Sequence, residues 1–257
     1  MIRNSHLVIP DPHSIPGHSN ERAEGIGKLI ADLKPEVVIN MGDGADMESL
    51  SSYDKGLGSF HGRSYEKDID AFLDFEDRLW EPMRRQKKKR PRRIFLEGNH
   101  EHRIKKAMDQ MPEYTGHRYG ISFRDLDLDH YYDDVVEYEG GTPGIVTVDG
   151  VSYAHYFIAG VSGRPVSGEH QAYALITKNF TSCTQGHTHT VDWSVRTDTF
   201  GRKIMGLVCG VGIDYNSSWA GHSNDLWWRG VVFKRHVEDG VYDPQFISME
   251  SLKKEYG

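Results

Sequence analysis

Five short apolar runs in this 257-residue chain are each followed or interrupted by aspartate, asparagine or histidine. The runs are HLVIP, EVVINM, RIFLE, VSYAHYF and FTSCTQ, and their polar groups are Asp11-Pro12-His13, Gly42-Asp43-Gly44-Ala45-Asp46, Gly98-Asn99-His100-Glu101, His155 and Gly186-His187-Thr188-His189. Short β-branched runs bounded by Gly and Pro are typical of buried strands. Functional side chains of open α/β sheets lie in loops at the carboxyl ends of strands. The recurrence therefore predicts strands whose ends share one site.

Helical patterns separate these runs, at residues 20–34, 66–83 and 170–179. Asn20 is a candidate N-cap for the first of them. Alternation of strands and helices indicates a layered α/β architecture. The last quarter of the chain instead has strand-like stretches at 202–213, 227–237 and 242–250, which predict a second, antiparallel sheet packed on the first. No repeat or interdomain linker is visible, so we expect one domain over residues 1–257.

Composition bounds the setting of the protein. No apolar run approaches the ~20 residues of a membrane-spanning helix, and no export signal is visible at the N-terminus. The two cysteines, Cys183 and Cys209, cannot form a disulfide framework. These features predict a cytoplasmic protein without a membrane partner. The net charge of −7 gives no general attraction to nucleic acid.

Three stretches leave alternatives open. Residues 84–93, RRQKKKRPRR, are either a solvated loop or a basic surface for a phosphate backbone. The acidic stretch at 124–139 is expected on the surface. Residues 48–65 are rich in Gly and Ser, which predicts a mobile loop at the rim of the site that selects the substrate.

The ligand types narrow the metal. Carboxylate, imidazole and amide oxygen suit Mn²⁺, Fe, Zn²⁺ or Mg²⁺, and no thiolate is placed to select a softer ion. The polar groups are too numerous for one tetrahedral zinc ion. Their number suits two divalent ions that share a carboxylate.

In order and content, the five motifs resemble the signature of calcineurin-like metallophosphoesterases. The layout is most similar to small bacterial and phage-encoded members, including the Trp228-Arg229-Gly230 strand; a phage member would act in the host cytoplasm. The resemblance implies an α-β-β-α sandwich of two packed mixed sheets flanked by helices, and two metal ions, with Mn²⁺ preferred. It places Asp11, His13 and His189 on the first metal, Asn99, His155 and His187 on the second, and Asp43 between both.

The same resemblance implies hydrolysis of a phosphoester by a bridging hydroxide. His100 would be the acid beside the scissile phosphate, and Asp46 would orient it. Arg103 is either a contact to the substrate phosphate or half of a salt bridge, and His170 is a candidate for the lining of the site. His102 matches no ligand position. Trp219, Trp227 and Trp228 are expected in the core, with stacking on a base as the alternative.

Three functions remain open at this point. The likeness to phage-type members favours a phosphodiesterase or nuclease that acts on nucleic acid. A phosphomonoesterase acting on a protein, a nucleotide or a small molecule is the alternative. The third is a non-catalytic protein that uses the metals only for stability, and the intact His100 and Asp46 weigh against it.

Overall fold

The computed structural model describes residues 4–53, 55–86, 90–116, 120–161 and 163–257. Its first sheet has six strands in the order β11-β10-β1-β2-β3-β4. The strands are β1 (His6–Ile9), β2 (Val37–Asn40), β3 (Arg92–Leu96), β4 (Asp134–Val136), β10 (Gly230–Glu238) and β11 (Val241–Ser248). Strands β1 to β4 are parallel, whereas β10 pairs antiparallel with β1 and β11 pairs antiparallel with β10. The sheet is therefore mixed.

The second sheet has five strands in the order β5-β6-β7-β9-β8. They are β5 (Val146–Val148), β6 (Val151–Tyr153), β7 (Ser182–Gln185), β8 (Val191–Thr197) and β9 (Lys203–Cys209). Strands β6, β7 and β9 are parallel, and the antiparallel strands β5 and β8 close the two edges. This sheet is also mixed.

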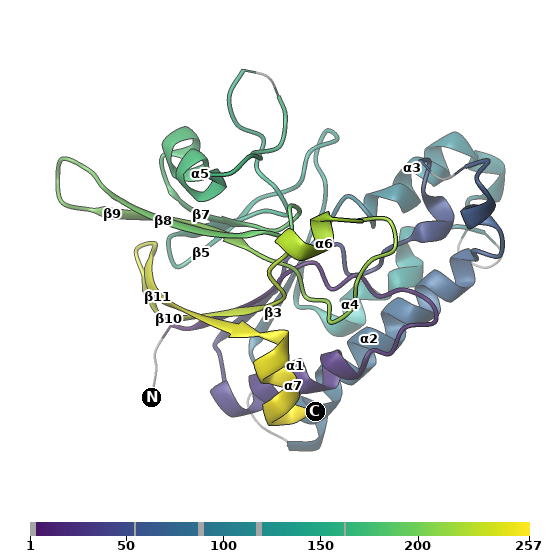
Figure 1. Cartoon of the computed structure of the whole chain (residues 1–257), viewed down its shortest axis with the longest axis horizontal. Helices are drawn as coiled ribbons and strands as arrows, with labels where there is room; N and C mark the ends of the chain where they lie inside the picture. The colour runs from purple at the N-terminus through teal and green to yellow at the C-terminus, as the bar shows by residue number, and fades with distance from the viewer. Residues whose placement is uncertain (1–3, 54, 87–89, 117–119, 162) are drawn as a thin grey trace.

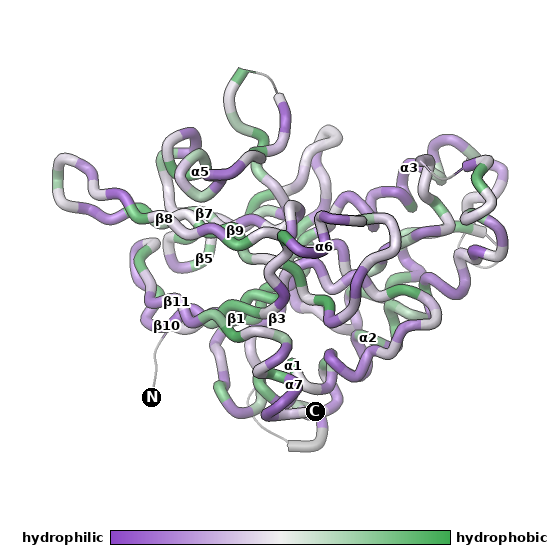
Figure 2. Tube along the Cα trace, viewed as in Figure 1, coloured by the Kyte–Doolittle hydropathy of each residue, from purple (hydrophilic) through white to green (hydrophobic). Residues whose placement is uncertain are grey.

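The two sheets pack face to face through a core between them. Successive residues of a strand point to opposite faces, and in β1 Val8 belongs to this inner core while Leu7 and Ile9 face the outer helices. Leu207 and Cys209 of β9 enter the same inner core from the second sheet. Because both faces are buried, β1 is apolar from Leu7 to Ile9, and Figure 2 shows hydrophobic residues gathered along it.

Helices cover both outer faces. On the first sheet lie α1 (Glu21–Leu33), α2 (Tyr65–Gln86) and α7 (Met249–Tyr256), and on the second lies α5 (Gln171–Asn179), as Figure 1 shows. The remaining helices are α3 (His102–Gln110), α4 (Leu128–Tyr131), α6 (Ser223–Leu226) and the 3₁₀ turns η1 (Glu48–Leu50), η2 (Gly58–Phe60), η3 (Pro112–Tyr114) and η4 (Phe123–Leu126). The predicted α/β sandwich of two mixed sheets is confirmed. Among the described residues, no helix is both long enough and apolar enough to cross a membrane.

The five apolar runs and the three helical patterns are confirmed as elements, but four expectations are wrong. The C-terminal strands do not form a sheet of their own, because β10 and β11 extend the first sheet while β9 joins the second. The second sheet is mixed rather than antiparallel. Asn20 makes no cap hydrogen bond; its amide donates to the carbonyl of Ala71 and the carboxylate of Asp74, which ties α1 to α2.

The fourth correction concerns the acidic stretch 124–139, which is not simply surface. It contains α4 and β4, and Leu126, Tyr131 and Tyr132 are buried. From residue 126 to 129 leucines alternate with aspartates, so Leu126 and Leu128 are buried whereas Asp127 and Asp129 are exposed.

The basic run at 84–93 lies only partly in the described chain, since residues 87–89 fall outside it. Arg92 and Arg93 form ion pairs with Asp134 and Asp133, at the amino end of β3. Asn99 follows the carboxyl end of the same strand. Arg92 and Arg93 therefore lie at the end of β3 away from the predicted metal ligands.

Candidate metal centre

The predicted ligands come together because parallel strands end at the same edge of a sheet. Asp11, Asp43 and Asn99 follow β1, β2 and β3, and His155 and His187 follow β6 and β7. The facing of the two sheets brings these edges together. Three groups of side chains there have the spacing of metal ligands: Asp11, His13 and His189; Asp43, His155 and His187; and His13, Asp46 and His100.

The first group is buried and its nitrogens converge. His13 Nε2 lies 3.1 Å from His189 Nε2, which is itself 3.4 Å from Asp11 Oδ2. His13 Nδ1 lies 2.8 Å from Asp46 Oδ1. A carboxylate only accepts hydrogen bonds, so Nδ1 carries the proton of a neutral His13. The lone pair on Nε2 then points toward His189 and Asp11.

In the second group, too, a hydrogen bond from one ring nitrogen of a histidine leaves the other nitrogen free to bind a metal. His155 Nδ1 donates to the carbonyl oxygen of Met41 at 2.9 Å, which leaves a lone pair on Nε2 of the neutral ring. That nitrogen lies 3.2 Å from Asp43 Oδ2 and 3.0 Å from Asn99 Oδ1. Asp43 Oδ2 also lies 4.0 Å from His13 Nε2 of the first group. Asp43 therefore lies between the two groups.

Lone pairs that face one another in a buried site repel each other, and a positive charge between them would stabilise them. Asp11 Oδ1 is buried and has no hydrogen-bond partner among the described residues, although unpartnered buried carboxylate oxygens are costly. Burial lowers the pKa of His155, but the charges of Asp43 and Asp11 outweigh it and raise that pKa to about 9. The same negative field would hold a divalent cation. The donor set of imidazole, carboxylate and amide oxygens thus fits one or two divalent ions.

Asp46 connects the first group to His100. His100 Nδ1 lies 2.7 Å from the backbone oxygen of Asp46 and 2.8 Å from its Oδ1, so one N–H is shared by two acceptors. Burial acts to lower the pKa of His100, and the charges of Asp43 and Asp46 overcome it and raise the pKa. Arg103 donates to the backbone oxygen of Asp46 at 2.9 Å and lies 3.2 Å from His100 Nε2. The predicted contact between His100 and Asp46 is present.

Glu101 is a residue of the site to which the sequence assigned no role. Its buried carboxylate accepts hydrogen bonds from the backbone N–H groups of Asp43, Ala45 and Gly98. These bonds fasten the loop after β2 to the loop after β3 and so position Asp43. The residue belongs to the Gly98–Glu101 motif, but only the folded contacts reveal what it holds.

The glycines of the motifs allow close approach to the carboxylates. A Cβ at position 98 would collide with the backbone and carboxylate of Asp43, and a Cβ at position 186 would collide with the carboxylate of Asp11. In addition, Asp11, His13, Asp43, His187 and His189 have positive φ angles. Non-glycine residues in this region cost about 1–3 kcal/mol each and gather at functional sites. The backbone strain at these predicted ligands therefore indicates the same functional site as their metal-binding side chains.

Other predicted residues lie outside the metal-binding groups. His170 is exposed at the start of α5 and belongs to none of those found among the described residues. His102 bonds to Glu97 at 3.0 Å. Trp228 packs on the inner core, as expected. The core expectation is wrong for Trp219, which is 60% exposed and lies 5.5 Å from Trp227 between ring centres; Trp227 in turn lies against His189.

A cavity of about 530 Å³ adjoins the site, and we call it the α3 cavity. Its lining includes Asn99, His187, Arg103 and residues from the 48–65 stretch. The predicted position of that stretch at the rim is confirmed, while its predicted mobility stays a prediction.

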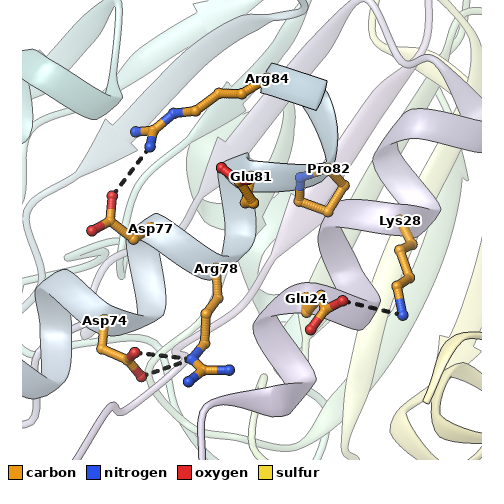
Figure 3. Close-up of a pocket in the computed structure, with 8 residues that line it drawn as sticks. All are labelled: Glu24, Lys28, Asp74, Asp77, Arg78, Glu81, Pro82 and Arg84. Carbon is orange, nitrogen blue, oxygen red and sulfur yellow. Dashed lines mark hydrogen bonds and ion pairs between the residues drawn. The ribbon is translucent and has the colours of Figure 1, made fainter. Parts of the chain in front are cut away.

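A second cavity of about 540 Å³ lies between α1 and α2 (Figure 3). Its charged side chains pair with one another, Glu24 with Lys28 and Asp74 with Arg78. Since none of the predicted ligands lines it, this cavity carries none of the chemistry of the metal centre.

Comparison with protein-family models and curated sequences finds no match, so the assignment of a function depends on the residues of this chain. No protein-family model matches the chain. No curated protein sequence is significantly similar to it either.

Proposed function

We propose that this protein is a metal-dependent phosphoesterase similar to the calcineurin-like metallophosphoesterases, with two divalent ions in the centre. The position of Asp43 carries the proposal. Its carboxylate lies within 4.0 Å of His13 Nε2 on one side and 3.2 Å of His155 Nε2 on the other. One carboxylate between two sets of imidazoles is the arrangement expected for a dinuclear site.

The chain's own side chains divide the work. Asp11, His13 and His189 would hold one ion, Asn99, His155 and His187 the other, and Asp43 both. Two such ions, of which Mn²⁺ is the leading choice and Fe, Zn²⁺ or Mg²⁺ the alternatives, would neutralise the phosphate and activate water as the nucleophile. Glu101 keeps Asp43 in place through the three backbone bonds described above.

His100 is the proposed proton donor to the leaving oxygen. Donation from Nε2 requires a cationic ring, because Nδ1 keeps its proton toward Asp46. Asp46 and Asp43 favour that cationic form by raising the pKa of His100. Arg103 Nη2, 3.2 Å from His100 Nε2, is placed to bind an oxygen of the same phosphate.

The substrate we propose is a phosphodiester of nucleic-acid chemistry. A phosphomonoester of a protein, nucleotide or small molecule is the alternative. Arg92 and Arg93 of the basic run do not support a long nucleic-acid track at the site, since they pair with aspartates at the far end of β3. The choice between a phosphodiester and a phosphomonoester substrate therefore depends on the groups that border the metal centre.

The test is hydrolysis of bis-p-nitrophenyl phosphate and p-nitrophenyl phosphate by the purified protein with Mn²⁺, Fe²⁺, Zn²⁺ or Mg²⁺. We expect turnover of the diester, and we expect His100→Ala to lower kcat by about 10²- to 10⁴-fold without loss of bound metal. His222→Ala is the matched control, because this exposed histidine lies outside the metal-binding groups of the described chain.

One outcome would contradict the proposed function, and another would contradict only the role of His100. Absence of turnover with every metal would favour a non-catalytic, metal-stabilised protein. Equal turnover by wild type and His100→Ala would leave hydrolysis standing and remove His100 as the acid.

A further inference from the structure

The α3 cavity lies directly beside the metal centre. Asn99 and His187, two proposed ligands of the second ion, form part of its wall. A phosphate held at the centre would therefore have one of its substituents in the cavity. With about 530 Å³, the cavity falls within the range of small-molecule sites, about 300–1,000 Å³, and suits one or two nucleotide units.

The cavity is positively charged. Arg103, Lys106 and Lys55 line it, and none of its described lining residues is acidic. The guanidinium of Arg103 donates to backbone oxygens and lies beside His100, and no carboxylate partner is found for it in the described chain. Lys106 is exposed and likewise lacks an acidic partner within the described ranges. These cations are available to an anionic ligand.

The two cations of α3 lie one behind the other. Arg103 and Lys106 are three residues apart on one helix, so their side chains leave the same face, with Cβ atoms about 5–6 Å apart. Arg103 is next to His100, where the cleaved phosphate would lie. Lys106 is one turn farther along the helix, where a second anionic group of the same molecule would lie.

Flat and apolar groups supply the rest of the wall. Tyr156 lies against His187 with 4.7 Å between ring centres, so an aromatic face borders the centre itself. Phe60 and Pro165 also line the cavity. Aromatic faces stack on bases without regard to sequence. The cavity therefore combines a place for a base with a place for a second phosphate.

We propose that the α3 cavity binds a nucleotide unit of the substrate that carries a second phosphate besides the one that is cleaved. The proposal rests on the phosphoesterase function proposed above and names its substrate class. Lys106 is the residue that recognises the second phosphate. The preferred substrates are then short single-stranded oligonucleotides or nucleotides with two separate phosphates, rather than duplexes.

The experiment measures binding separately from hydrolysis. Thymidine 3′,5′-bisphosphate and thymidine 5′-monophosphate are titrated calorimetrically into the full-length protein loaded with Mn²⁺. We expect the bisphosphate to bind more tightly, and we expect Lys106→Ala to weaken its binding by about three- to tenfold. The affinity of the monophosphate should stay within about twofold, because it has no second phosphate for Lys106.

Lys203→Ala is the matched control. Lys203 is exposed at the start of β9, which lies at the opposite side of the molecule from α3 in Figure 1. Equal affinities of wild type for the two nucleotides, or equal effects of Lys106→Ala and Lys203→Ala, would overturn the proposal. If Lys106→Ala selectively weakens the bisphosphate but no phosphoester is hydrolysed with any metal, the two-phosphate site stands and the phosphoesterase function fails.

Discussion

Asp46→Asn isolates one charge in the centre. Asp46 Oδ1 lies 2.8 Å from His13 Nδ1 and 2.8 Å from His100 Nδ1, so one oxygen serves a proposed ligand and the proposed acid together. Asparagine can keep that oxygen and both hydrogen bonds while it removes the negative charge. The substitution thus tests the charge and leaves the geometry in place.

The magnitude follows from the two bonds. A hydrogen bond to a charged group contributes about 1.5–3 kcal/mol and a neutral one about 1 kcal/mol, so each bond loses about 0.5–2 kcal/mol, with a midpoint of about 1.25 kcal/mol. With about 1.4 kcal/mol per factor of ten, each loss is about tenfold. We expect Mn²⁺ to bind about tenfold more weakly through His13. In addition, we expect kcat on bis-p-nitrophenyl phosphate at saturating Mn²⁺ to be at least about tenfold lower than in the wild type, because His100 loses the charge of its partner.

The assay measures Mn²⁺ affinity by calorimetry and kcat at saturating Mn²⁺, so that weaker metal binding and slower chemistry are separated. Asp134→Asn is the control, since it makes the same chemical change at the amino end of β3, where Asp134 pairs with Arg92. Unchanged metal affinity and unchanged kcat in Asp46→Asn would refute the argument that this charge supports both histidines.

Two further predictions concern the metal bridge and a buried acid. Asp43→Asn should lose bound metal and activity together, measured by elemental analysis and diester hydrolysis; unchanged metal content would exclude the bridging role. Burial raises the pKa of Glu76 from 4.5 to about 8, although Tyr132 and Trp80 donate to it and oppose the shift. Because the folded state keeps this proton longer than the unfolded chain, stability is fully present below about pH 4.5 and declines as pH rises through about 8. Urea unfolding at about pH 5.5 and about pH 8.5 should show a loss of about 3 kcal/mol from this group, and Glu76→Gln should remove that part of the pH dependence.

Much of the fold could be read from local patterns. The run around Leu7, Val8 and Ile9 is apolar at every position because both faces of its sheet are covered, and such runs stand out in a sequence. Strands β4 and β8 give a weaker signal, because all three residues of β4 are only partly buried and most residues of β8 are exposed. The sequence signal for which strands pair with each other is weaker still, because nothing within β10 indicates that it pairs with β1 rather than with β9.

The candidate site divides in the same way. Asp11, Asp43, Asn99, His155 and His187 could be proposed from sequence, because each follows a recognisable strand and carries a side chain suited to metals. Within each sheet their convergence follows because parallel strands end at one edge, and the packing of the two sheets then brings the two edges together. The role of Glu101, the sharing of one Asp46 oxygen by two histidines, and the position of Lys106 in the α3 cavity could not be proposed.

The sequence by itself determined which segments become strands and which residue types stand at their ends, because both depend on neighbours a few positions away. The tertiary structure alone decided what those residues touch. Glu101 reaches the backbone of Asp43, and Lys106 faces a cavity completed by Phe60 and His187. Hydrogen bonds and charges act over a few ångströms of space, whatever the separation along the chain, so these roles exist only once the two sheets have packed.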